Sequence, residues 1–135
     1  MNLDVVLEEV IPHPIEAVWA VLTDAPAISD WLMPASDFRP VVGTKFRLKT
    51  QNLSPDGWVS AQIIDFDPPR RMVWSWSGSD DSIPSTVTFE LTQEDAGTRL
   101  KLTHVGEIDP IVAGLLRGGW PGRIELIRRY LDGAA

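Results

Sequence analysis

Between residues 86 and 105, apolar and polar side chains alternate through two consecutive segments that are separated by a short polar turn. A period of two predicts β-strands with one buried face, and two such strands joined by a short turn form an antiparallel hairpin. The apolar positions are Val87, Phe89, Leu91, Leu100 and Leu102. His104 falls on the same side, where an imidazole is costly unless something binds it. The pattern therefore places this histidine in a core or at a cavity.

Four other segments have the texture of strands. Leu3 to Ile11 is rich in Val, Leu and Ile, and residues 45–49 alternate between charged and apolar positions. In the strand expected at 58–66 the inward set stays open, because two interleaved sets of apolar residues compete for it. One set is Val59, Ala61 and Ile63, and the other is Trp58, Ile64 and Phe66. Residues 72–76 alternate again, with three large side chains on one face: Met72, Trp74 and Trp76.

Helical spacing appears in three places. Pro14 and Pro26 each suit the first turn of a helix, so we expect two short helices after the first strand. After Pro110 the period changes to about 3.6, and the apolar residues fall on one face: Ile111, Leu115, Leu116, Trp120, Ile124, Ile127 and Leu131. Because proline is poorly tolerated inside a helix, Pro121 indicates that this long helix either starts near Trp120 or is kinked there. Arg123, Arg128, Arg129 and Asp132 are expected to face solvent.

These elements predict an α+β fold with a single domain over residues 1–135. About six strands form a curved antiparallel sheet, and its apolar face must be covered. The C-terminal helix is the element long enough to cover it. A concave sheet wrapped round one helix can hold a ligand between the two.

Composition narrows the classes of partner and chemistry. The chain has 135 residues, a formal net charge of -7 and no cysteine. The acidic balance argues against nucleic acid and anionic membrane surfaces, and the lack of thiols together with two histidines argues against a metal site. No signal peptide or membrane-spanning segment is evident, so we expect a soluble cytoplasmic protein without a cofactor. Oligomeric state stays open between monomer and homodimer.

Six tryptophans are spread along the chain against one tyrosine. Large rings from several elements either fill a core or converge on a cavity, and the sequence leaves both interpretations open for each ring. Trp120 is the strongest cavity candidate among them, because it would stand at the mouth of the space between sheet and helix. The full set of candidate cavity residues is His104, Trp31, Trp74, Trp76, Trp120, Phe46, Phe89 and Leu102.

Several short segments, in order along nearly the whole chain, resemble the homologues of the heat-shock-protein-90 ATPase activator. They are Val18-Trp19 to Leu22-Thr23-Asp24, Trp31, Val42 to Phe46, residues 65–76 (DFDPPRRMVWSW), 86–91 (TVTFEL), 97–106 (GTRLKLTHVG), Gly119-Trp120, Leu126 and Tyr130-Leu131. The resemblance implies the helix-grip fold of the START-like and polyketide-cyclase (SRPBCC) superfamily. That superfamily includes lipid carriers, hormone receptors, cyclases and co-chaperone domains, so the fold alone does not assign an activity.

The leading hypothesis is a domain that binds a small hydrophobic or aromatic molecule between the sheet and the C-terminal helix. A second is an enzyme of the cyclase or dehydratase type in which His104 or Tyr130 transfers a proton. A third is a protein-interaction module that stimulates a chaperone ATPase, although the eukaryotic co-chaperone acts through more than this domain. A filled core without a cavity would favour the third.

Overall fold

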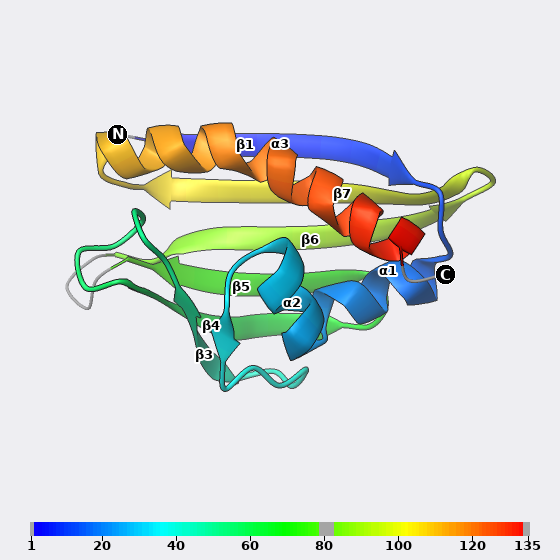
Figure 1. Cartoon of the computed structure of the whole chain (residues 1–135), viewed down its shortest axis with the longest axis horizontal. Helices are drawn as coiled ribbons and strands as arrows, with labels where there is room; N and C mark the ends of the chain where they lie inside the picture. Colours follow the sequence, from blue (N-terminus) through cyan, green and yellow to red (C-terminus); the bar gives the residue numbers. More distant parts are fainter. Residues whose placement is uncertain (1, 79–82, 134–135) are drawn as a thin grey trace.

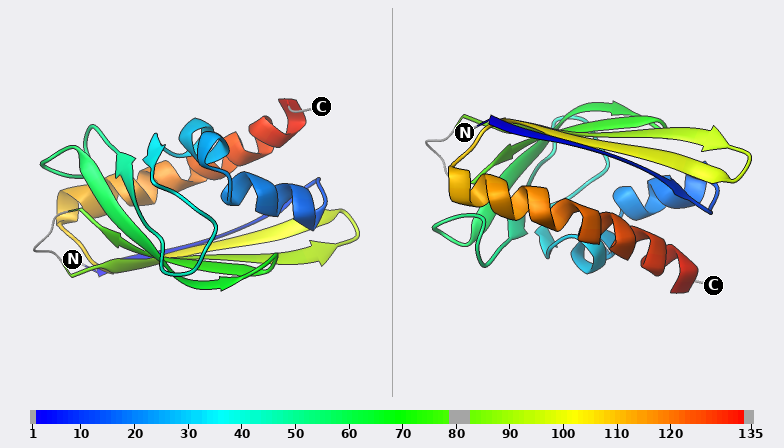
Figure 2. Two further views of the ribbon diagram at one scale, coloured as in Figure 1. Left: turned by 90° about the horizontal axis from the view of Figure 1, so that it is seen from below. Right: turned by 90° about the horizontal axis from the view of Figure 1, so that it is seen from above.

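The computed structural model describes residues 2–78 and 83–133. Seven strands form one antiparallel sheet in the order β1-β7-β6-β5-β4-β3-β2, and three helices lie together on one side of it (Figure 1, Figure 2). The strands are β1 (Asn2–Ile11), β2 (Ala35–Ser36), β3 (Lys45–Lys49), β4 (Trp58–Asp67), β5 (Arg71–Ser77), β6 (Ser85–Glu94) and β7 (Gly97–Glu107). The helices are α1 (Ile15–Leu22), α2 (Ala25–Trp31) and α3 (Pro110–Gly133).

The predicted α+β helix-grip architecture is confirmed, with two short helices after the first strand and a long helix at the end of the chain. The sheet has seven strands rather than about six. The additional strand, β2, has two residues that pair with β3, Ala35 opposite Leu48 and Ser36 opposite Arg47. Two residues are too few to produce a detectable period, which is why the hydrophobic pattern did not predict it.

The helix α3 runs from Pro110 to Gly133 with Pro121 inside it, so the predicted alternative of a start near Trp120 is wrong. The Asp109 carboxylate accepts hydrogen bonds from the backbone N–H groups of Ile111 and Val112, which supplies the cap that the early start needs. The buried face follows the predicted stripe in its second half. Its buried residues are Ala113, Leu116, Trp120, Ile124, Ile127 and Leu131.

A β-bulge explains why strand β4 could not be assigned an inward face from its sequence. Up to Ile63 the buried residues are the odd-numbered ones, and the register with β5 then shifts between Ile63 and Asp65. The extra residue, Ile64, is 50% exposed, and beyond it Phe66 lies opposite the buried Met72. One inserted residue changes the parity of the strand. The set of Val59, Ala61 and Ile63 is therefore the inward one, and of the other set only Phe66, beyond the bulge, turns toward the core.

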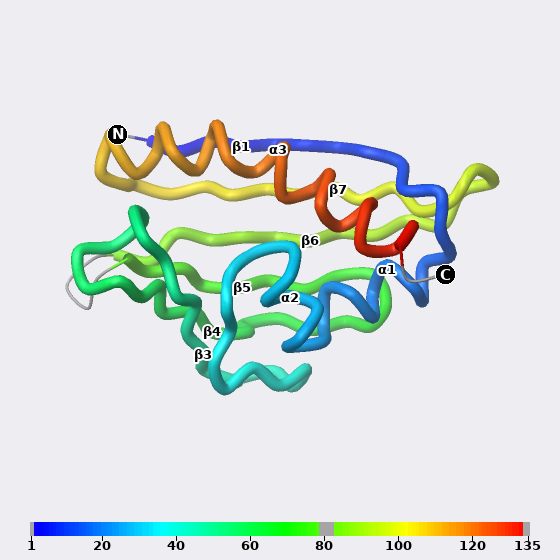
Figure 3. The backbone as a smooth tube through the Cα atoms, viewed as in Figure 1, coloured from blue at the N-terminus to red at the C-terminus, as the bar shows by residue number. Residues whose placement is uncertain are grey.

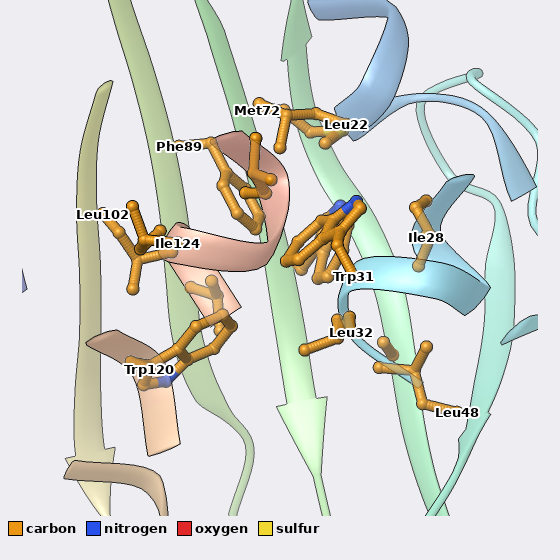
Figure 4. Close-up of a cluster of buried hydrophobic side chains, with 14 of the residues drawn as sticks. Leu22, Ile28, Trp31, Leu32, Leu48, Met72, Phe89, Leu102, Trp120 and Ile124 are labelled. Carbon is orange, nitrogen blue, oxygen red and sulfur yellow. The ribbon is translucent and has the colours of Figure 1, made fainter. Parts of the chain in front are cut away.

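The core lies between the sheet and the helices, and side chains from all three helices meet those of the strands there (Figure 4). Aromatic rings form its centre. The centroid of the Trp74 ring lies 4.8 Å from that of Phe89 and 5.0 Å from that of Phe46, in edge-to-face arrangements. Trp31 packs edge-on against Phe89 and donates its indole N–H to the backbone carbonyl of Val21. Such pairs add to the stability that comes from burying their area.

One glycine is required where strand β1 ends against the β6–β7 turn. Gly97 has a φ of +140°, and a Cβ atom there would lie 2.1 Å from the carbonyl oxygen of Ile11. We expect Gly97→Ala to lower the free energy of unfolding by about 3 kcal/mol, because the backbone must move as well as adopt a strained φ. Chemical denaturation of both proteins measures the difference.

Gly43→Ala is the matched control, because Gly43 has a φ of +91° but no atom within 4 Å of the added Cβ. We expect it to lower the free energy of unfolding by only about 1–2 kcal/mol, the cost of the left-handed conformation alone. Equal losses in the two variants would mean that the contact with Ile11 relaxes without cost.

Candidate functional site

A cleft of about 660 Å³ opens between the first half of α3, the end of α2 and the segment that follows β3. The loop between β3 and β4 extends to the same end of the molecule as the first turns of α3 (Figure 3). Thr50 shapes this loop, because its hydroxyl accepts hydrogen bonds from the backbone N–H groups of Asn52 and Leu53. The apolar residues that line the cleft are Leu32, Met33, Leu53, Trp76, Leu115, Leu116 and Trp120.

Trp76 from β5 and Trp120 from α3 lie side by side at the floor of the cleft. Their ring centroids are 5.9 Å apart, and the two residues are 3% and 2% exposed. A smaller hollow of about 390 Å³ also has Trp76 and Leu53 in its lining. The aromatic floor is therefore mostly covered by protein and presents a small ring surface to the space above it.

His104 lies behind this floor and has hydrogen bonds at both ring nitrogens. The indole N–H of Trp120 donates to Nδ1 over 3.0 Å, and Nε2 lies 2.8 Å from the hydroxyl oxygen of Ser85. Because an indole N–H can only donate, Nδ1 is the acceptor and the proton of the neutral ring is on Nε2. The Ser85 hydroxyl oxygen accepts a hydrogen bond from this N–H group, and the hydroxyl donates a hydrogen bond to the carbonyl oxygen of Trp76, over 3.1 Å. We call this series the Trp120–His104–Ser85 chain.

The strand register places the members of this chain on one face of the sheet. Ser85 lies directly opposite Trp76 on β5, and Val87, two residues further along, lies opposite His104 on β7. Close packing continues at the next pair, since a Cβ atom at Gly106 would lie 2.7 Å from the Cβ of Ser85. Burial lowers the pKa of His104 from 6.5 to about 4, so the imidazole is neutral near neutral pH.

The structure brings together three of the eight candidate residues and separates the other five from the cleft. Trp76 and Trp120 line it, and His104 contacts both of their rings from behind, with centroid distances of 5.2 and 5.9 Å. The other five lie in the core and are at most 1% exposed: Trp31, Trp74, Phe46, Phe89 and Leu102.

The polar part of the cleft was not predicted from the sequence. Its lining includes Asp30 from α2, Lys49 at the end of β3 and Arg123 from α3. Arg123 is half-buried and lines the cleft, so the expectation that it faces solvent is wrong. Gly114, Gly118 and Gly119 also line the cleft. A glycine-rich stretch at helical spacing was a usable signal for this open wall.

Residues 2–78 and 83–133 contain neither a cluster of metal-ligating side chains nor a helix that could span a membrane. No three His, Asp or Glu side chains lie close enough together there to hold a metal ion. Within the same residues, no helix is long and apolar enough to cross a membrane.

The low pKa of His104 predicts a specific pH dependence of stability. The unfolded chain takes up this proton near pH 6.5 and the folded chain only near pH 4. His104 therefore contributes stability above pH 6.5 that is lost as the pH falls to 4, by about 3 kcal/mol in total. We expect the variant His104→Gln to lack this pH-dependent contribution to stability. The glutamine amide can accept the hydrogen bond from the Trp120 indole and donate one to the Ser85 hydroxyl, but it does not titrate.

Urea unfolding of both proteins at pH 7.0, 5.5 and 4.5 measures this component, because the two lower values lie between pH 6.5 and pH 4. The component is the difference between the two proteins in how steeply the free energy of unfolding changes with pH. Contributions from all other groups are common to both proteins and cancel. Parallel pH profiles would contradict the buried, neutral assignment of His104.

Comparison with known proteins agrees with this architecture. Protein MLL2253 from Mesorhizobium loti superposes with a TM-score of 0.83 at 28% identity, over 98% of each chain. CalU16 from Micromonospora echinospora has a TM-score of 0.78 at 24% identity, over 96% of this chain and 74% of its own. DynU16, from the dynemicin biosynthetic locus, has a TM-score of 0.80 at 20% identity, and this chain spans 47% of its length. These last two show the fold alone.

No curated protein matches the chain. Residues 12–132 match the family described as activator of Hsp90 ATPase homolog 1-like protein. The match covers all three helices, except the last residue of α3, and every strand except β1, which precedes it. The resemblance found in the sequence is thereby confirmed. The chain belongs to this family, and it has the helix-grip fold.

Proposed function

We propose that this protein binds a small apolar or aromatic molecule in the cleft above Trp76 and Trp120. The observation that carries the proposal is the wall of the cleft formed by α3. This wall includes Gly114, Gly118 and Gly119, and no atom lies within 4 Å of a Cβ built at any of them. The glycines leave open space where larger side chains would close the cleft.

These glycines are unfavourable for the helix itself. Each glycine in a helix interior costs about 1 kcal/mol relative to alanine, and the chain's own packing does not require any of the three. The core-facing positions of the first half of the helix are Ala113, Leu116 and Trp120, and the glycines occupy other positions, which line the cleft. A ligand that fills the space beside the glycines would supply the packing that these positions lack.

The size and lining of the cleft suit a small molecule. A volume of about 660 Å³ lies within the range of ligand sites in proteins, which are mainly apolar with a few polar groups. The small exposed part of the Trp76 and Trp120 rings offers an apolar contact at the floor of the cleft. Membership of a superfamily whose fold supports ligand binding adds to the proposal.

The contacts of His104 favour binding over proton transfer. Both ring nitrogens are occupied by protein partners, and a pKa of about 4 makes the imidazole a poor base near neutrality. Tyr130 follows Trp120 by nearly three helical turns, about 15 Å along α3, and is not part of the cleft lining. The two residues considered for an enzyme therefore do not share a site.

Gly118→Leu tests the proposal, because it fills the cleft from a helix position where leucine is intrinsically favourable. We expect the variant to be at least as stable as the natural chain and to bind a neutral apolar probe, N-phenylnaphthylamine, at least about tenfold more weakly. Probe fluorescence in a titration measures binding, and thermal unfolding with and without probe checks it.

Gly133→Leu is the matched control. Gly133 also lies in α3 with no atom within 4 Å of an added Cβ, but it lies at the far end of the helix from the cleft and does not line it. We expect its affinity for the probe to stay within about twofold of the natural chain, a difference below 0.5 kcal/mol. Equal weakening in both variants, or no probe binding by the natural chain, would overturn the proposal.

A further inference from the structure

The cleft has two cationic side chains that lack a carboxylate partner, and these suggest what kind of ligand it takes. The argument depends on the proposed binding function. Among the described residues, four other arginines form ion pairs with nearby carboxylates: Arg71, Arg99, Arg128 and Arg129. Arg123 has no hydrogen bond or ion pair within that part of the chain, although it is half-buried. The N–H groups of its guanidinium therefore have no partner among the described residues, in a partly buried position.

Arg123 is well placed to reach a molecule that lies along the helix. It follows Gly119 by four residues and Trp120 by three, so it belongs to the same side of α3 as these cleft residues. The lining of the helix wall runs from Gly114 to Arg123, which spans about 14 Å at the helical rise. The arginine therefore stands at one end of an otherwise apolar and glycine-rich wall.

Lys49 adds a second positive charge from the opposite wall. Its ammonium nitrogen lies 5.2 Å from the ring centroid of Trp58 and forms no ion pair with a described carboxylate. The acidic residue in the lining is Asp30, and it pairs with neither cation among the residues described. The lining thus has a net positive charge within a chain whose formal net charge is -7. A positive cleft on an acidic protein attracts anions locally.

We infer that the ligand is an apolar molecule with one oxyanion group, a carboxylate or sulfonate, that is bound by Arg123. The guanidinium group has parallel N–H donors that match an oxyanion in two hydrogen bonds, and partial burial strengthens them. The apolar part of the ligand lies against the glycine wall and above Trp76 and Trp120.

A pair of fluorescent probes with the same ring system tests this inference. Anilinonaphthalene sulfonate carries an oxyanion, and N-phenylnaphthylamine lacks it. We expect Arg123→Gln to weaken binding of the sulfonate about tenfold or more, the loss of a charge-assisted pair, and to change binding of the neutral probe by less than about twofold. Arg123→Lys keeps the charge but not the paired donors, so intermediate binding of the sulfonate is expected.

Arg117→Gln is the control, because Arg117 is exposed on the same helix, does not line the cleft and has the same charge. It should leave the affinity for both probes unchanged, and circular dichroism should show the same fold in all variants. Should Arg123→Gln misfold, Arg123→Lys must still weaken the sulfonate selectively.

The outcomes separate the two proposals. If both probes bind and Arg123→Gln weakens them equally or not at all, the oxyanion inference is overturned while binding in the cleft stands. If neither probe binds the natural chain, both are overturned. Selective loss of the sulfonate supports both.

Discussion

The Trp120–His104–Ser85 chain is the interaction on which the arrangement of helix and sheet depends. It connects α3 through one imidazole to β6 and β7, and then to the backbone of β5. Each link has one donor and one acceptor, so a shift of the helix by one residue would leave buried polar atoms unpaired, at about 1–3 kcal/mol for each. Apolar packing alone tolerates small shifts. The hydrogen bonds select one register between the helix and the sheet, and with it the position of the cleft.

Most of the fold was predictable because strand and helix periods are local properties. The hairpin at 86–105 shows this, since Phe89 lies opposite Leu102 and Val87 opposite His104, as the alternation requires. The failures occur where local pattern is absent or changes phase. Strand β2 has two residues, the bulge at Ile64 changes parity within one strand, and α3 begins at Pro110, where Asp109 caps it, and includes Pro121. Periodicity has no information on pairing partners or caps.

The candidate site was predictable in its general position and not in its composition. The sequence pattern placed the aromatic candidate residues on the inner side of the fold, and all of these candidates are buried there. The pattern does not indicate how far each one lies from the cleft. Trp31, Trp74 and Phe89 fill the middle of the space between sheet and helices, and only Trp76 and Trp120 reach the cleft. Lys49 and Arg123 come from distant parts of the chain. They come close only in the folded protein, so the sequence around each of them gives no sign of the other.

The two halves of α3 differ in composition, and the difference accounts for the position of the cleft. In the second half, Ile124 and Ile127 pack fully against the core, and α1 and α2 lie beside this end of the helix (Figure 1). In the first half, Ala113, Leu116 and Trp120 are buried as well, but the glycines beside them leave a cleft open toward the end of α2 and the loop that contains Thr50. The packed half therefore supports a helix whose other half is intrinsically weak. Anchoring at Trp120, near the junction, lets the glycine-rich half remain helical without filling the space beside it.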